Sequence, residues 1–428
     1  MRDCPTARSP SLRIALISLD TRGGIQPYVA LARGLLAAGH SVRLLAPADF
    51  TPFLEAWGVP AAPLSGSVEE VLRQSGGTAE RGSVATIILA RREMGSRLRV
   101  WTREALEACA GCDLILGGLG GMVVGLAVAE RLGIPFVEAH LHPMGEPTAD
   151  FPGIMLGALP RWLGATARRW SHGLTYLALW MPMRGVIEEV RRELVGNRPP
   201  PDREHLPVLY GFSAEVVPRP AEWHPRRAVT GYWTLPAPDG WTPPPELEAF
   251  LAAGPTPVCI GFGSMNSADP VSTGKLVREA VRQAGVRAVL LSGWGGLHDS
   301  GGDGVLVTDA VPHDWLFPRM SAVVHHGGAG TTAAGLRAGA PSVLVPFTMD
   351  QPFWAGRVET LGVGPAHIPR RRLSVERLAA ALRQATTDSG MRARAAAVGA
   401  RLRSEDGVTR AVALLQQAAD EFRLARAS

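Results

Sequence analysis

Residues 311–365 read VPHDWLFPRMSAVVHHGGAGTTAAGLRAGAPSVLVPFTMDQPFWAGRVETLGVGP. Ala322–His325 is apolar enough for a buried strand and Thr332–Ala338 favours a helix, so His326–Thr331 is predicted to be the turn between them. A helix that begins there presents unpaired N–H groups and the positive end of its dipole. Three glycines of the turn have no Cβ to keep an anion away: Gly327, Gly328 and Gly330. The turn is therefore predicted to bind a phosphate group.

The surrounding residues narrow the kind of phosphate. No lysine follows the glycines as in a nucleoside triphosphate loop, and the G-x-G-x-x-G spacing of dinucleotide sites is absent. His326 and Thr331 supply side-chain donors instead, and Asp350 and Gln351, after the apolar run Ser342–Phe347, suit sugar hydroxyls. Together they indicate a sugar-diphosphate site. The alternative is a glycine turn that only allows close packing and an Asp-Gln pair that only caps a helix.

Composition excludes several classes of protein. A chain of 428 residues predicts two or more domains, and an excess charge of only +5 gives little support for nucleic-acid binding. No apolar run approaches the length of about 20 residues that crosses a membrane, and Met1–Arg13 lacks a signal-peptide core, so we expect a cytoplasmic protein. Four scattered cysteines do not form a disulfide framework. Contact of an arginine-rich face with an anionic membrane stays open.

Alternating elements indicate two α/β units. A strand at Leu12–Leu19, a helix from Pro27 to about Ala38 and a strand at Ser41–Ala46 open the chain, and a second series begins at Val258. We predict two Rossmann-like, doubly wound domains with a site in the cleft between them. The predicted boundaries are a first domain at residues 1–205, a linker at 206–228, a second domain at 229–405 and a last helix at 406–428.

Four further segments add to the signature in residues 311–365: Thr21–Tyr28 (TRGGIQPY), Thr230–Trp233 (TGYW), Gly261–Met265 (GFGSM) and Ser292–Leu297 (SGWGGL). With residues 311–365 they resemble the family 1 glycosyltransferases of the GT-B fold over nearly the whole chain. The most similar branch contains sterol glucosyltransferases and bacterial enzymes that glycosylate antibiotic aglycones. In that family the last helix crosses back onto the first domain.

The resemblance implies a donor site without metal or cofactor. His326 would contact the diphosphate, and the donor sugar would meet Asp350 and Gln351. Some members stack a tryptophan on the base where this chain has Ala310, so Val311 backbone groups would hold the base here. The remaining donor-binding residues would contact the diphosphate: Ser264, Gly328, Ala329, Gly330 and Thr331.

The general base is where the chain departs from the family. Relatives commonly carry an aspartate in the loop after the first strand, at the position of Gly24, and a glycine takes no proton. Asp20 in the same loop is the first candidate, and His140 and His142 are the others, because imidazole titrates near neutral pH. Each also has a structural alternative, since Asp20 can cap a turn or helix and His142 can be a loop contact. The remaining alternative is that no side chain acts as the base.

Acceptor and reaction follow from the resemblance. The apolar segment Met144–Met183 corresponds to the family's acceptor pocket, where we expect Met144, Phe151 and Trp180, with Gly24, to contact the acceptor; the alternative is that these residues form core. The expected activity is inverting transfer of a hexose, from UDP-glucose or a dTDP-deoxysugar, to a polyketide, macrolide or sterol-like hydroxyl, by a monomer or homodimer. A catalytically silent auxiliary protein and a sugar-nucleotide epimerase are the alternatives.

Overall fold

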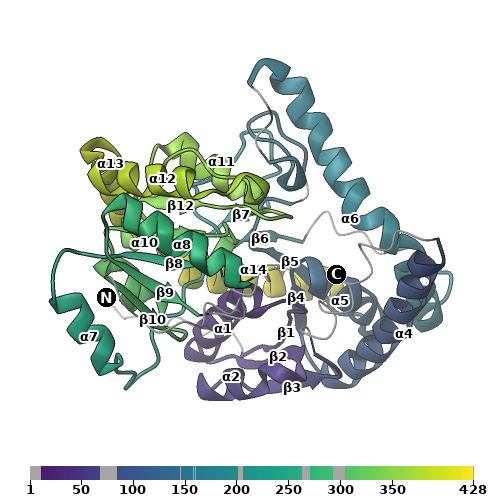
Figure 1. Ribbon diagram of the computed structural model, residues 1–428. Coiled ribbons are helices and arrows are strands. Elements are labelled where there is room, and N and C mark those ends of the chain that lie inside the picture. Colours follow the sequence, from purple (N-terminus) through teal and green to yellow (C-terminus); the bar gives the residue numbers. More distant parts are fainter. Residues whose placement is uncertain are drawn as a thin grey trace, which may run out of the picture.

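The computed structural model describes residues 11–67, 84–144, 146–157, 159, 161–200, 206–262, 270–292 and 304–427. Within them the chain forms two α/β domains, each built on one parallel sheet (Figure 1). This confirms the expected pair of Rossmann-like domains. None of the helices in the described ranges combines the length and the apolar composition needed to cross a bilayer.

The first sheet has seven parallel strands in the order β3-β2-β1-β4-β5-β6-β7. Strand β1 lies at its centre, and its residues after Arg13 are all apolar and buried, as expected for a parallel strand covered on both faces. Ile14 and Leu16 pack into the core on one face of the sheet, whereas Ala15 and Ile17 pack into the core on the other face. The strands are β1 (Arg13–Ile17), β2 (Ser41–Pro47), β3 (Ala61–Leu64), β4 (Leu114–Gly117), β5 (Phe136–His140), β6 (Val208–Tyr210) and β7 (Arg227–Val229).

Long helices cover this sheet. The helical elements of the first domain are α1 (Arg22–Ala37), η1 (Ala48–Phe50), α2 (Thr51–Ala56), α4 (Val84–Ala108), α5 (Leu119–Leu132), η2 (Ile154–Leu156), η3 (Arg161–Leu163) and α6 (Gly164–Val195). The C-terminal part of α6 packs with α4 and α5, and its N-terminal half extends beyond them (Figure 1). Gly133 ends α5 in the left-handed conformation, φ 66°, which a glycine adopts without strain.

The predicted linker at residues 206–228 is wrong. Strands β6 and β7 both pair with the first sheet, so this segment completes the first domain. The proline-rich composition that suggested a linker belongs instead to the loop between these strands, where Arg219 donates hydrogen bonds to the carbonyl oxygens of Trp223, His224 and Arg227. The chain crosses to the second domain only after Val229.

The second sheet has five parallel strands in the order β10-β9-β8-β11-β12. Successive residues of β11 again enter two cores, Ala322 and Val324 on one face and Val323 on the other. The strands are β8 (Val258–Gly261), β9 (Ala288–Leu291), β10 (Val305–Thr308), β11 (Ala322–His325) and β12 (Ser342–Leu344). The helical elements are α7 (Pro245–Ala252), α8 (Pro270–Ala284), α9 (His313–Leu316), η4 (Phe317–Arg319), α10 (Ala329–Ala338), α11 (Gln351–Leu361), η5 (Arg370–Arg372), α12 (Val375–Thr387) and α13 (Ser389–Arg403).

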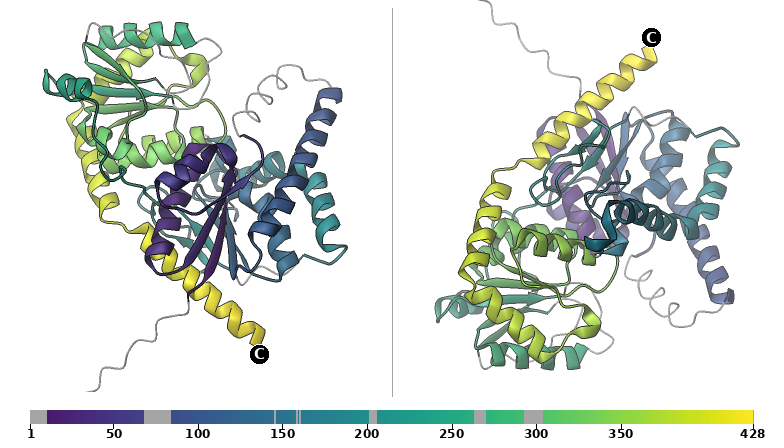
Figure 2. Two further views of the ribbon diagram at one scale, coloured as in Figure 1. Left: turned by 90° about the horizontal axis from the view of Figure 1, so that it is seen from below. Right: turned by 90° about the horizontal axis from the view of Figure 1, so that it is seen from above.

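The last helix, α14 (Gly407–Ala427), returns to the first domain, as Figure 2 shows. It packs on α1, and Ala411, Leu415 and Ala419 are buried in the core on that side of the first sheet. The chain leaves the first domain near Gly231 and returns to it near Gly407, and these two crossings touch each other. A Cβ built on Gly407 would lie 2.5 Å from the carbonyl carbon of Gly231. Two glycines therefore let the two backbones cross in contact.

The domains also share a hydrophobic core. Phe151, Tyr210 and Phe212 of the first domain lie in one buried cluster with Phe353 and Trp354 of the second. The ring centroids of Phe151 and Phe353 are 5.8 Å apart, in an edge-to-face arrangement. This core fixes the loops of one domain against those of the other.

Candidate active site

The predicted anion-binding turn joins β11 to α10. Gly328 is the N-cap of α10, whose first N–H groups lack intrahelical partners. Gly327 has φ 93°, a conformation that favours glycine, and its N–H donates to Nδ1 of the buried His325 at 3.1 Å. The buried His325 side chain thus stabilises the conformation of the turn. Sequence analysis assigned the following His326 and missed this supporting role.

His326 lies across the N-terminus of α10. A Cβ on Gly328 would be 2.5 Å from Nε2 of His326, so the ring occupies space that only a glycine leaves open. Its Nδ1 is buried and has no hydrogen-bonding partner among the described residues. Burial lowers the pKa of His326, and Asp350 acts in the opposite direction. The side chain is a neutral imidazole near neutral pH, with one N–H to donate.

Asp350 and Gln351 lie at the start of α11. Trp354 Nε1 donates to Asp350 Oδ2 at 2.9 Å, which fixes the orientation of the carboxylate. Gln351 is buried, and its Oε1 accepts a hydrogen bond from the Phe347 N–H at 2.7 Å. Met349, just before them, has φ 58°, a strained value for a residue with a side chain. Tertiary contacts therefore fix this loop in a defined conformation.

The other predicted donor residues lie in different surroundings. Ala329, Gly330 and Thr331 form the first turn of α10 and are partly exposed. The Val311 side chain is buried in core, so only its backbone is available to a nucleobase. Ser264 lies outside the described residues.

Asp20 fills the space beside Gly24. Helix α1 begins at Arg22, earlier than the predicted Pro27, so Gly24 lies in its first turn and Asp20 just before it. A Cβ on Gly24 would be 2.2 Å from both Cγ and Oδ2 of Asp20. The Asp20 carboxyl group therefore occupies the place from which a side chain at position 24 would extend. Its Oδ1 accepts a hydrogen bond from the Thr21 N–H at 2.6 Å.

The surroundings of Asp20 make it a stronger base than an ordinary carboxylate. The side chain keeps an exposed surface, but protein atoms replace much of its bulk water. This desolvation raises the pKa of Asp20 to about 6; the Thr21 N–H opposes the shift and the charge of Asp350 adds to it. The pKa lies close to that of a general base for neutral pH.

The two halves of the site meet at the N-terminus of α10. A Cβ on Gly330 would lie 3.3 Å from the carbonyl oxygen of Gly23 in the first domain. Pro27, four residues along α1, has no N–H to pair with that oxygen. The Asp20 loop and the anion-binding turn are thus neighbours, although about 300 residues separate them in the sequence.

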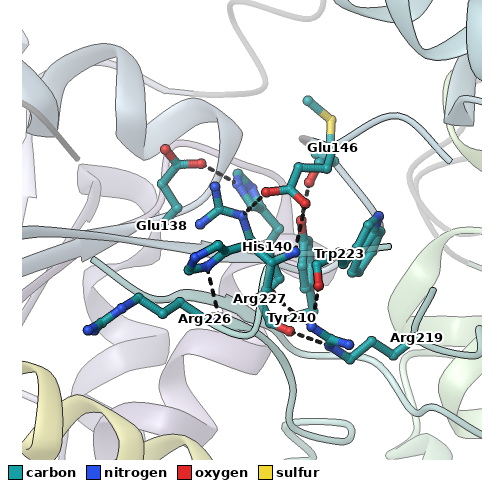
Figure 3. Close-up of polar contacts among 10 residues, drawn as sticks. Glu138, His140, Glu146, Tyr210, Arg219, Trp223, Arg226 and Arg227 are labelled. Carbon is teal, nitrogen blue, oxygen red and sulfur yellow. Dashed lines mark hydrogen bonds and ion pairs between the residues drawn. The ribbon is translucent and has the colours of Figure 1, made fainter. Parts of the chain in front are cut away.

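His140 is not placed to act as a base. It is 2% exposed, and its Nε2 lies 3.1 Å from Oε2 of Glu138. Figure 3 shows this pair beside Tyr210, whose hydroxyl donates to the Met144 carbonyl oxygen, and the ion pair of Arg227 with Glu146. His140 therefore belongs to the polar network that holds the loop after β5, which corrects its prediction as a catalytic residue.

His142 lies closer to the donor side. Its Nε2 is buried without a partner among the described residues. Burial lowers the pKa of His142 to about 4, Asp350 opposes this and His140 adds to it. A group with so low a pKa holds a proton weakly, so His142 is a poorer general base than Asp20.

The predicted acceptor residues differ in exposure. Gly24 is buried beneath Asp20, Met144 is partly buried, and Trp180 is partly exposed beside Tyr176 on α6. Phe151 is 3% exposed in the interdomain core, so the core interpretation holds for it and the pocket prediction is wrong.

Two ionisable residues near the turn, Arg22 and His313, were not predicted from the sequence. His313 begins α9 and stacks on Phe317, with centroids 4.3 Å apart. Burial, together with the charges of Arg22 and His326, lowers the pKa of His313 to about 4. The Arg22 guanidinium lies over the Phe53 ring of the first domain, 5.0 Å from its centroid, and its charge acts on His313 of the second. Their separation in the sequence left no local signal for this grouping.

Family models match both domains. The glycosyltransferase family 28 N-terminal domain matches residues 14–144, and the C-terminal domain of erythromycin biosynthesis protein CIII-like proteins matches residues 297–415. Among curated proteins, the sterol 3-beta-glucosyltransferase of Neosartorya fischeri is 36% identical over 94% of this chain and 29% of its own length. That of Cryptococcus neoformans is 35% identical over 94% of the chain and 27% of its own length. The chain thus spans less than a third of these relatives.

Solved structures agree on the fold. The glycosyltransferase VinC in complex with dTDP has a TM-score of 0.67 at 20% identity, covering 96% of this chain and 100% of its own. SnogD from Streptomyces nogalater has a TM-score of 0.65 at 23% identity, covering 95% and 99%. With both domains matched and the sheet topologies described above, the chain belongs to the family 1 glycosyltransferases of the GT-B fold.

Proposed function

We propose that the protein is an inverting glycosyltransferase that moves a hexose from UDP-glucose or a dTDP-deoxysugar to a hydroxyl of a lipophilic small molecule. The observation that carries this proposal is the Asp20 carboxyl group, which fills the side-chain space of Gly24 next to the anion-binding turn. The sterol 3-beta-glucosyltransferases among the relatives support a sterol-like acceptor, and a polyketide or macrolide acceptor rests on the resemblance of the sequence.

The donor half supplies leaving-group stabilisation. The N–H groups at the start of α10 and the His326 N–H would hold the diphosphate as the bond from C1 of the sugar to the phosphate oxygen breaks. That oxygen keeps the bonding electron pair. Asp350, oriented by Trp354, would accept hydrogen bonds from sugar hydroxyls. Among the described residues no cluster of three or more potential ligands could hold a metal ion, and metal independence stays a prediction.

The acceptor half supplies the base. As the acceptor oxygen bonds to C1 from the face opposite the diphosphate, its proton passes to Asp20, and the configuration at C1 inverts. A carboxylate with a pKa of about 6 is deprotonated at neutral pH and still basic enough to assist. Activity should therefore decline as the pH falls below about 6. A cytoplasmic location also stays a prediction.

A rescue experiment tests the base. UDP-glucose and a 3β-hydroxysterol would be incubated with wild type, Asp20→Asn and the double variant Asp20→Gly/Gly24→Asp, in which residue 20 has no side chain left to collide with the new one, and the glucoside would be measured by mass spectrometry. The single variant should lose about a hundredfold or more in turnover while binding UDP normally. The double variant should recover part of it, because a carboxylate returns to the same space from position 24. Full activity of Asp20→Asn would refute the assignment.

The second candidate is a catalytically silent GT-B protein that binds a sugar nucleotide or a partner transferase. Gly24 in place of the usual aspartate is the observation that favours it. Calorimetric titration with UDP and dTDP, beside the His326→Ala variant, separates the two when it is combined with an acceptor screen. Nucleotide binding lost in the variant together with transfer supports the enzyme, and binding without transfer to any hydroxyl supports the auxiliary protein.

A further inference from the structure

The outer side of the first half of α6 is apolar. Trp170 is 73% exposed, and the apolar residues that share its side of the helix are each more than a third exposed. Their spacing of three, four and seven residues places them on one face. These residues, here called the α6 stripe, are Leu163, Trp170, Leu174, Leu177 and Met181. The stripe is about 27 Å long.

The opposite side of the same half is polar and buried. Ser171 is 1% exposed, and its Oγ accepts a hydrogen bond from the Gly153 N–H at 2.7 Å. His172 Nε2 lies 3.0 Å from the Phe151 carbonyl oxygen, and Thr175 is buried beside them. A helix on a protein surface normally shows the reverse pattern, with apolar residues inward. The inverted polarity indicates that the stripe has an apolar or interfacial environment of its own.

Within the segment that carries the stripe, the charged residues have one sign. Residues 161–187 contain four arginines and no aspartate or glutamate. Arg169 pairs with Glu222, and Arg184 pairs with Glu188 at 2.7 Å, but these ion pairs lie at the surface, where such pairs are weak. They can exchange for phosphate groups at low free-energy cost. Exposed tryptophan and tyrosine beside arginine is the composition of a helix that lies in a membrane interface.

We propose that the α6 stripe docks the protein on the surface of an anionic lipid bilayer. The apolar side chains would enter the boundary between headgroups and acyl chains, with the helix parallel to the surface, while the arginines meet the lipid phosphates. A second copy of this chain fits less well, because two stripes facing each other would bring the same arginines together. The docking site would bring the enzyme to a lipophilic acceptor, and this last link rests on the proposed function.

Vesicle binding tests the stripe directly. The full chain would be sedimented with vesicles of phosphatidylcholine and phosphatidylglycerol in equal parts, and with vesicles of phosphatidylcholine alone, at low and high salt. The test variant is Trp170→Gln/Leu174→Gln/Leu177→Gln, and the matched control is Leu424→Gln, an exposed apolar residue on α14. We expect binding to the anionic vesicles that weakens with salt, and a loss of about tenfold or more only in the triple variant.

Two outcomes would overturn the docking proposal. One is wild-type protein that stays in solution with anionic vesicles. The other is a concentration-dependent dimer, seen by analytical ultracentrifugation, that the triple variant abolishes while vesicle binding is unchanged. Vesicle sedimentation separates this test from that of the proposed function, because it is measured without donor or acceptor. If neither the wild type nor any variant transferred a sugar, the proposed function would be refuted and the docking result would remain valid.

Discussion

At the scale of single residues, the site depends on positions where a side chain is missing. Gly24 leaves room for the Asp20 carboxyl group, and Gly328 leaves room for the His326 ring. In both cases the functional group comes from a neighbouring residue that extends over the glycine. The two glycines determine where a base and an N–H donor lie, although neither has functional atoms in a side chain.

Gly328→Ala should therefore damage the donor site and spare the fold. A Cβ there would be 2.5 Å from His326 Nε2, so the ring must move away from the α10 N-terminus. We expect UDP affinity to fall about tenfold, the value of one lost charge-assisted hydrogen bond, with little change in melting temperature. Calorimetry would measure the affinity. Gly173→Ala is the control, because a Cβ there meets nothing within 4 Å.

The sequence identified the residues of the turn but only part of their arrangement. His326, Asp350 and Gln351 could be predicted because strand, turn and helix follow one another locally. The relation of Asp20 to Gly24 could not be derived, since it depends on α1 beginning at Arg22. Pro27 suggested a later start, because proline favours a first helical turn, and here the helix accommodates it further in.

At the scale of elements, α14 acts as part of the first domain. Leu415 is fully buried with Leu31 and Leu35 of α1 in one core. Leu415→Ala should destabilise the protein by about 2–5 kcal/mol, through lost burial and the cavity left behind. Leu424→Ala on the same helix should have a negligible effect, because that side chain is 72% exposed. Denaturant unfolding would compare them, and equal losses would mean that α14 does not hold the first domain.

Pattern reasoning failed where an element was short. Strands β6 and β7 have three residues each, too few for a periodic signal, and prolines surround them. Their place in the first sheet follows from tertiary pairing with β5. Strands β1 and β11 were predicted because burial on both faces gives them almost continuous apolar sequences.

At the scale of the whole molecule, the two crossings are the sensitive point. Gly407→Ala would place a Cβ about 2.6 Å from backbone atoms of Gly231 and Tyr232, which cannot rotate away as a side chain does. We expect a loss of about 1–3 kcal/mol and increased proteolysis between the domains. Differential scanning calorimetry with limited proteolysis would measure both. A variant as stable as Gly173→Ala would show that the crossings separate freely.

The interdomain core could not be predicted from the sequence. Phe151 and Phe353 are about 200 residues apart, and each reads as an ordinary apolar residue of its own region. Their contact depends on how the finished domains pack. The choice between pocket and core for Phe151 therefore needed the structure.

Because Gly231 and Gly407 are in contact, the two connections between the domains cross at one point, about which one domain would rotate relative to the other. Because both covalent connections pass through the same point, sliding of one domain along the other would stretch a connection, whereas swivelling stretches neither. The Asp20 loop belongs to the first domain and the turn before α10 belongs to the second, so this rotation would move one relative to the other. A small rotation there would therefore change the distance between the base and the leaving group, by an amount that grows with the distance of the site from Gly231 and Gly407. The contact between these two glycines would thus set the spacing of reacting groups that lie far from it.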